Sequence, residues 1–205
     1  MKTPTQLPPA PLDLTLTLAG SAVSRFLPLL GEGFLVQGPG GESVEGFLQK
    51  AAGISPAYLK ERVQTVFLDG RALDDFGTAV VEGGAVLALS AAMPGLAGAV
   101  LRRGGFYAAM HRQISHAAGG SAAAGAPVTV TLKLFNLVAR ELGPGLLDRG
   151  VRIPGLQVKD FVLRQGRWIW TECTAAAVAG KPVEPEQVES LLPPDRTVLL
   201  AVKSA

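Results

Sequence analysis

The chain has 205 residues, of which 48% are hydrophobic and 18% are charged, with a formal net charge of +2. This composition suits a globular protein with one large or two small domains, and it excludes a chain that is disordered throughout. The near-neutral charge argues against nucleic-acid binding, and the lack of a long apolar run or a signal peptide predicts a cytoplasmic protein without membrane association.

The first half of the chain predicts one small domain over residues 12–92, after a disordered proline-rich N-terminus at residues 1–11. Ser43 can cap a helix that runs to Lys50, and Asp69-Gly70 predicts a tight turn between two strands. Apolar alternation or short apolar runs predict strands at 12–18, 34–36, 63–68 and 85–89.

The second half repeats this order of elements over residues 127–205. A helical turn is expected at 137–142 and a helix near 157–164. Trp168 and Trp170 alternate as they would on a strand that buries both rings. The strands predicted in this half are 128–135, 151–153, 176–178 and 198–202.

Each repeat has a single well-formed amphipathic helix, which can cover only one face of a sheet, so each should be a two-layer α+β domain. The order of elements is that of the β-grasp (ubiquitin-like) fold, in which a mixed sheet wraps one helix and the first and last strands pair in parallel. We therefore expect two tandem β-grasp domains, at 12–92 and 127–205. Residues 93–126, rich in glycine and arginine, should form a strap and a flexible linker between them.

The second repeat resembles the molybdopterin-synthase small subunit and the thiamine sulfur carriers. The likeness lies in the Ala139-Arg140-Glu141-Leu142 turn, the strand end Val151-Arg152-Ile153-Pro154-Gly155, the hairpin Val178-Ala179-Gly180-Lys181-Pro182-Val183 and the closing strand Asp195-Arg196-Thr197-Val198-Leu199. The resemblance implies the β-grasp fold and a protein partner from molybdenum or tungsten cofactor metabolism or from sulfur metabolism. The family carries sulfur on a C-terminal Gly-Gly, whereas this sequence ends Val202-Lys203-Ser204-Ala205.

The strap at 93–126 offers the candidate binding residues. Arg102-Arg103-Gly104-Gly105 resembles the tail of ubiquitin-like modifiers, so cleavage after Gly105 would make the chain a sulfur-carrier precursor. Arg102, Arg103, Gly104, Gly105, His111 and Arg112 could instead bind a small anion or a partner through arginine and exposed backbone N–H groups. The simpler interpretation is a connecting strap whose arginines stay in water.

The remaining polar residues predict no catalytic group, metal site or cofactor. His111 and His116, five residues apart, do not share one helix face as metal ligands would. The carboxylates of Asp69, Asp74 and Asp75 suit a turn, and Cys173 suits a small buried position. The sequence therefore favours a non-catalytic tandem module that acts as a protein-interaction or accessory subunit.

Overall fold

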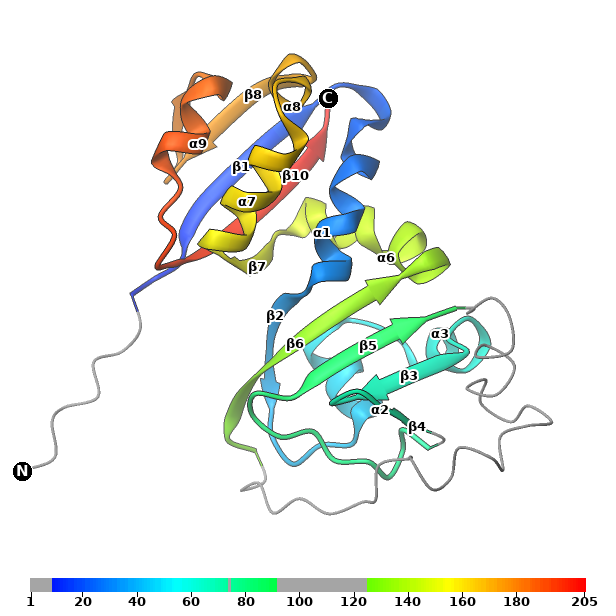
Figure 1. Cartoon of the computed structure of the whole chain (residues 1–205). Helices are drawn as coiled ribbons and strands as arrows, with labels where there is room; N and C mark the ends of the chain where they lie inside the picture. The colour runs from blue at the N-terminus through cyan, green and yellow to red at the C-terminus, as the bar shows by residue number, and fades with distance from the viewer. Residues whose placement is uncertain (1–8, 74, 92–124) are drawn as a thin grey trace, which may run out of the picture. The chain divides into compact units, whose positions relative to one another are not determined.

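The computed structural model describes residues 9–73, 75–91 and 125–205 (Figure 1). These residues form helices and ten strands in parallel and antiparallel pairings, so the predicted α+β class is confirmed. The chain divides into two compact units: unit 1, Met1–Ser24 with Gly145–Ala205, and unit 2, Arg25–Pro144. Unit 1 therefore combines the two ends of the chain, whereas unit 2 is one continuous stretch of the sequence.

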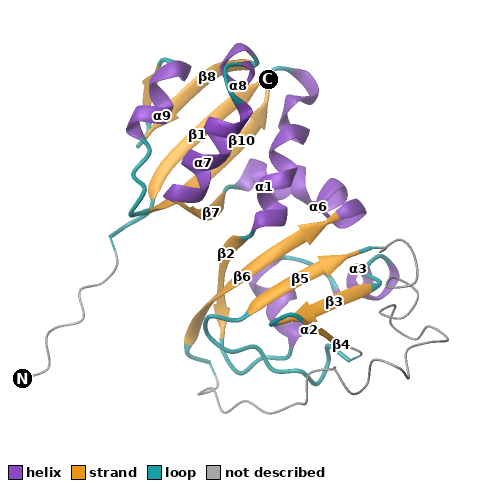
Figure 2. Ribbon diagram, in the orientation of Figure 1, coloured by secondary structure: helices purple, strands orange, loops and turns teal. Residues whose placement is uncertain are grey.

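Unit 2 has a mixed sheet with the strand order β4-β3-β5-β6-β2 (Figure 2). β5 and β6 are parallel neighbours, and the other neighbours are antiparallel. The strands are β2 (Phe34–Pro39), β3 (Thr65–Leu68), β4 (Arg71–Leu73), β5 (Val86–Ser90) and β6 (Pro127–Phe135). The helical segments are α1 (Leu27–Glu32), α2 (Val44–Phe47), the π-helical η2 (Leu48–Ala52), α3 (Pro56–Glu61) and the first part of α6 (Asn136–Arg149).

Unit 1 has a mixed sheet with the strand order β7-β10-β1-β8-β9. β1 and β10 are parallel neighbours, and the other neighbours are antiparallel. The strands are β1 (Leu12–Leu18), β7 (Val151–Pro154), β8 (Cys173–Val178), β9 (Lys181–Val183) and β10 (Thr197–Ser204). The helical segments are the start of η1 (Gly20–Phe26), α7 (Gly155–Gln165), α8 (Trp168–Thr171), η3 (Pro185–Gln187) and α9 (Val188–Leu191).

The central strands alternate buried apolar and partly exposed residues, as predicted from their sequence period. This alternation directs one row of side chains from each strand into the core of its unit. The buried rows are Leu14, Leu16 and Leu18 on β1, Val130, Leu132 and Leu134 on β6, and Val198, Leu200 and Val202 on β10. Burial of these rows is what holds the central strands in register.

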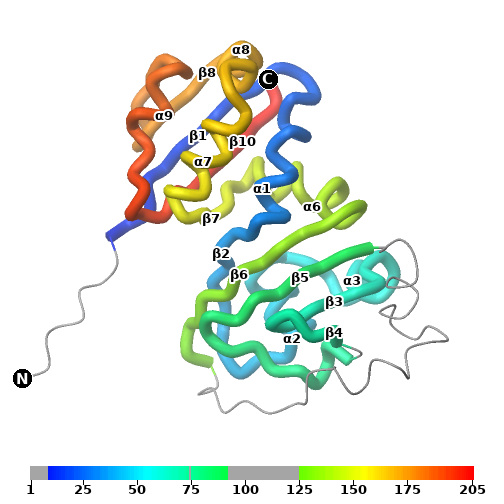
Figure 3. Tube along the Cα trace, in the orientation of Figure 1, coloured from blue at the N-terminus to red at the C-terminus, as the bar shows by residue number. Residues whose placement is uncertain are grey.

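Each parallel pair joins strands from opposite halves of the sequence, whereas the sequence predicted pairing within one half. Leu16 of β1 faces Val202 of β10, and Leu132 of β6 faces Leu87 of β5. Figure 3 shows β1, in blue, beside β10, in red. The predicted boundaries 12–92 and 127–205 therefore do not follow the compact units, because β1 lies in unit 1 and β6 lies in unit 2.

The two repeats thus exchange their first strands: β1 pairs with strands of the second repeat, and β6 pairs with strands of the first. Two physical features allow this strand exchange. The two first strands have the same alternation of apolar and polar residues, so the local pattern does not distinguish one partner from the other. The segments that follow them are largely helical: η1 and α1 follow β1, and α6 follows β6. A two-residue hairpin would hold each first strand against the next strand, and neither connection is of that kind.

The predicted caps and turns are confirmed. The Ser43 hydroxyl accepts a hydrogen bond from the Gly46 backbone N–H at 3.1 Å and caps the start of α2. Asp69 and Gly70 both have positive φ, at 50° and 78°, and join β3 to β4. The equivalent turn of the second repeat joins β8 to β9 through Ala179 at φ 49° and Gly180.

Two predicted elements differ in the structure. The helical turn expected at 137–142 is the longer helix α6, which continues through Pro144 to Arg149. A Cβ on Gly143 would lie 2.4 Å from Leu27 Cδ2 and 3.0 Å from Leu30 Cδ1, so this glycine lets α6 pack closely on α1. The strand proposed around the tryptophans is wrong: residues 168–171 form α8, with both indole rings half-buried beside the buried Ile169.

Among the helices formed by the described residues, none is both long enough and apolar enough to cross a membrane.

Candidate functional site

The binding residues predicted from the sequence lie outside the described part of the chain. Arg102, Arg103, Gly104, Gly105, His111 and Arg112 all fall within residues 92–124. Cleavage after Gly105 and anion binding by this strap therefore stay predictions. The described residues offer other candidates, which are a polar network in unit 2, the thiol of Cys173, and exposed leucines on the helices of unit 1.

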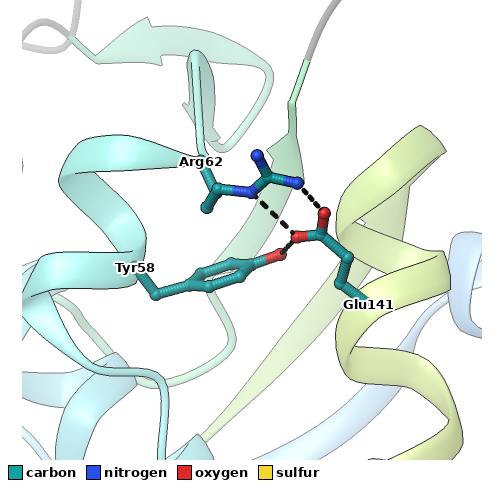
Figure 4. A network of polar contacts seen from close by, with 3 residues as sticks. All are labelled: Tyr58, Arg62 and Glu141. Carbon is teal, nitrogen blue, oxygen red and sulfur yellow. Dashed lines mark hydrogen bonds and ion pairs between the residues drawn. The ribbon is translucent and has the colours of Figure 1, made fainter.

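The polar network in unit 2 joins α3 to α6 (Figure 4). Tyr58 lies on α3 and Arg62 follows four residues later, so their side chains leave the same side of the helix. The Tyr58 hydroxyl donates to Glu141 Oε2 at 2.7 Å, and Arg62 Nε donates to the same oxygen at 3.2 Å. Arg62 Nη2 pairs with Glu141 Oε1, which completes a two-pronged arginine–carboxylate contact.

The protonation of this network suits a structural contact and opposes proton transfer. Hydrogen bonding to Arg62 first, and to Tyr58 second, lowers the pKa of the Glu141 carboxyl below its ordinary value of 4.5. Burial, reinforced by the hydrogen bond to Glu141, raises the pKa of the Tyr58 hydroxyl. Glu141 therefore stays ionised and Tyr58 stays protonated around neutral pH, with both carboxylate oxygens engaged. The network fixes α3 to α6 and has no group poised to act as a general acid or base.

Glu141 belongs to the Ala139-Arg140-Glu141-Leu142 segment that carries the family resemblance, yet the sequence did not single it out as half of a contact. The available signal in the sequence was the four-residue spacing of Tyr58 and Arg62. Their partner lies 83 and 79 residues further along the chain. Pairing over that separation depends on the packing of α6, which is not visible in a local pattern.

Cys173 is buried, as predicted. Its Sγ donates to the Ala175 carbonyl oxygen at 3.2 Å, and burial raises the pKa of the thiol. A reactive cysteine needs the opposite shift, because the thiolate is the nucleophile. The side chain therefore fills space in unit 1, beside the bulge at which β1 and β8 shift register.

The turn aspartates also have structural roles. Asp69 Oδ1 accepts a hydrogen bond from the Val86 backbone N–H at 2.8 Å. Asp75 Oδ1 accepts from the Gly77 N–H at 2.8 Å, and Oδ2 contacts the Thr78 hydroxyl at 3.2 Å. Asp74 lies outside the described residues. Within the described segments there is no group of three or more histidine, cysteine, aspartate or glutamate side chains placed to hold a metal ion.

The exposed leucines of unit 1 form the most suggestive surface, which we call the leucine face: Leu156, Leu163 and Leu191. Their exposed fractions are 54%, 52% and 45%. Leu156 and Leu163 lie seven residues apart on α7 and so share one side of that helix. Leu191 ends α9, which packs against α7 (Figure 2).

The start of α7 is held tightly against the chain that follows α9. The Gly155 N–H donates to the Arg196 carbonyl oxygen at 2.7 Å. A Cβ built on Gly155 would lie only 1.9 Å from the Pro193 carbonyl oxygen, so only glycine fits. This contact fixes the start of α7, and with it the backbone of Leu156, against residues 193–196, which follow α9.

Neither protein-family models nor curated proteins nor solved structures include a match to this chain.

Proposed function

We propose that this protein is a non-catalytic tandem β-grasp (ubiquitin-like) module that binds a protein partner as an accessory subunit. The observation that carries the proposal is the leucine face on α7 and α9, where three large apolar side chains are about half exposed. Large apolar side chains that stay exposed on packed helices are commonly interaction sites, since leaving them in water is unfavourable. Bound to a partner, Leu156, Leu163 and Leu191 would supply the apolar centre of the contact.

Pairing of a partner strand with β4 or β9 is a less suitable mode of binding. Each of these strands, which end the sheets of their units, has three residues, too few for a long ladder of backbone hydrogen bonds. In β9, Pro182 has no N–H to donate, and Lys181 carries a charge that discourages pairing. The helical side of unit 1 is therefore favoured over its β9 edge.

The polar groups of the described residues support a binding role over an enzymatic one. Tyr58, Glu141 and Cys173 have pKa values shifted away from those that an acid–base catalyst or a nucleophile needs. Each of the three also has a hydrogen-bonding partner within its own unit. Their arrangement stabilises the fold and leaves recognition to the surface.

The β-grasp assignment draws support from the strand order of unit 2. Its centre holds a parallel pair, β5 and β6, flanked by antiparallel neighbours on both sides. The resemblance of the second repeat to sulfur carriers then implies a partner from molybdenum or tungsten cofactor metabolism or from sulfur metabolism. We place the encounter in the cytoplasm, where the lone Cys173 would stay reduced.

The experiment is affinity purification of the tagged full chain from its native host, followed by native mass measurement of the complex. Leu156→Glu combined with Leu163→Glu places two charges on the leucine face and should abolish a stoichiometric complex. Leu137→Glu is the matched control, because Leu137 is a leucine of unit 2 with a similar exposed fraction of 46%. The control should retain the partner at the wild-type ratio.

Two results would refute the proposal. One is recovery of the tagged wild-type chain only as a free species with the mass of a single chain, 21.2 kDa plus the tag. The other is a stoichiometric complex that persists in the double variant while the circular dichroism of the variant matches wild type. Identification of the partner by peptide mass spectrometry then tests the metabolic assignment separately.

A further inference from the structure

Both sheet neighbours of β1 come from the C-terminal half of the chain. β1 pairs in parallel with β10 and antiparallel with β8, so it lies between two strands that follow residue 172. Further bonds join the same halves: Ala205 N–H to the Leu18 carbonyl at 2.8 Å, and Ala19 N–H to the Glu172 carbonyl at 2.8 Å. Residues 12–19 are thus an integral part of unit 1.

Both sheet neighbours of β6 come from the N-terminal half. β6 lies between β2 and β5, and the Gly84 N–H donates to the Thr129 carbonyl at 2.8 Å. The start of α6 adds side-chain contacts to the same half. Asn136 Nδ2 donates to the buried Ser90 Oγ at 3.1 Å, and Glu141 binds Tyr58 and Arg62. Residues 127–141 are thus an integral part of unit 2.

Separating the two halves would damage both units at once. Withdrawal of β1 would expose Leu14, Leu16 and Leu18, and would leave β8 and β10 with unpaired backbone edges. Withdrawal of β6 would do the same to β2 and β5. A connecting peptide is unnecessary to keep the halves together, because each half completes the sheet centre of a unit that the other half mainly builds.

We propose that residues 9–91 and 125–205 are mutually dependent binding partners, so that the protein remains one folded particle when the backbone between them is cut. The surface on each side is the central slot of a sheet, and the partner that fits it is the first strand of the other half. This inference goes beyond the proposed accessory function and does not depend on the leucine face.

The first test cuts the full-length protein. A site for a sequence-specific protease is inserted between Gly119 and Gly120, the purified chain is cleaved, and the product is measured by size-exclusion chromatography and native mass spectrometry. We expect one particle with the mass of the whole chain and both fragments in equal amounts. Release of the fragments under native conditions overturns the proposal, and so does a particle of twice that mass, which would mean that halves of different chains pair.

The second test traps the strand pairing in the protein before cleavage, in a Cys173→Ala background. Two cysteine pairs match the observed neighbours: Thr15→Cys with Ala201→Cys, and Ala88→Cys with Lys133→Cys. Two control pairs use the same four positions in the alternative pairing within each half: Thr15→Cys with Ala88→Cys, and Lys133→Cys with Ala201→Cys. All four positions are half-buried, so the pairs differ mainly in which strands must be neighbours.

After oxidation and cleavage, the first two variants should run as one band on a non-reducing denaturing gel. The control variants should run as two fragments that still titrate two free thiols. The reverse result, with disulfides only in the control pairs, would show that each half folds with its own first strand and would overturn the proposal. The disulfide pattern reports strand pairing alone. A negative result here would therefore overturn the strand-pairing proposal and leave the proposed partner binding untouched.

Discussion

In both units, the first strand of one repeat and the last strand of the other form the parallel pair at the sheet centre. The two units differ in which of these two strands lies next to the hairpin. In unit 2 the last strand of a repeat, β5, lies next to the hairpin strand β3, and the Asp69 N–H donates to the Val86 carbonyl at 2.9 Å. In unit 1 that place is taken by a first strand, β1, and the Ala179 N–H donates to the Asp13 carbonyl at 2.8 Å. β10 then occupies the place that β6 has in unit 2.

The difference shows which properties of a central strand the sheet requires. The two central strands run parallel to each other, so exchanging their order leaves each antiparallel to its outer neighbour. Both also alternate buried apolar residues with partly exposed ones. A strand can therefore fill either central position if it has the right direction and the right alternation of buried and exposed side chains. Which strand takes which position is set by the rest of the chain.

The largest expected effect comes from truncating one buried leucine on each exchanged strand. Leu16 and Leu132 have exposed fractions of 0% and 1%, so Leu16→Ala and Leu132→Ala should each lower the free energy of unfolding by about 2–5 kcal/mol. Because β1 lies in unit 1, Leu16→Ala should reduce amide hydrogen-exchange protection mainly in β8 and β10. Leu132→Ala should reduce it mainly in β2 and β5. Loss of protection in β2 and β5 from Leu16→Ala would contradict the exchange.

The second effect concerns how α7 begins in unit 1 and how α2 begins in unit 2. Gly155→Ala should destabilise unit 1 by about 1–3 kcal/mol, because the new Cβ would meet backbone oxygen and has no room to move. Ser43→Ala removes the side-chain cap of α2 and should destabilise unit 2 by about 1 kcal/mol. Chemical denaturation measures both, with Gly145→Ala as a control in which only Arg149 Nη1 lies near the new Cβ. A control as destabilised as Gly155→Ala would refute the steric explanation.

The third effect compares the two hairpin turns. Asp69 and Ala179, the first residues of the two turns, both adopt a left-handed backbone conformation. This conformation costs an alanine about 1 kcal/mol relative to glycine. Ala179→Gly should therefore stabilise unit 1 by about 0.5–1 kcal/mol. Asp69→Ala should destabilise unit 2 by about 1–2 kcal/mol, since it also removes the bond to the Val86 N–H. Thermal denaturation measures both changes. A lower melting temperature for Ala179→Gly than for wild type would contradict the left-handed conformation assigned to Ala179.

The smallest effect is the pH dependence that the polar network gives to unit 2. The folded pKa of Glu141 lies below its ordinary value of 4.5, so its stabilising contribution is present above pH 4.5 and is lost as pH falls through the lower folded pKa. The folded pKa of Tyr58 lies above its ordinary value of 10.0, so its contribution is present below pH 10 and declines as pH rises. Melting temperatures of wild type and Glu141→Gln should therefore converge in acid.

Tyr58→Phe provides the control for this prediction. It should retain the acid dependence set by Arg62 and Glu141, and it should lose the alkaline dependence set by the phenol. An acid dependence in Glu141→Gln equal to that of wild type would mean that other carboxylates control the acid response of unit 2.

Local chemistry determined much of the secondary structure from the sequence alone. The alternation of Leu14, Leu16 and Leu18 predicted β1, Ser43 predicted the start of a helix, and Asp69-Gly70 predicted a hairpin turn. Each of these features is settled by a few neighbouring residues, through side-chain period, a capping hydroxyl, or tolerance of positive φ. That is why they could be read without the fold.

Only the tertiary structure decided which strands pair and which side chains meet. β1 would satisfy the same rules beside β5 or beside β10, because direction and alternation are equal in both cases. The continuation of α6 through Pro144 depends on the packing of Gly143 against Leu27 and Leu30, and the partner of Arg62 lies 79 residues away. Long-range pairing is a choice among alternatives with similar local energies, and the collective burial of the core makes that choice.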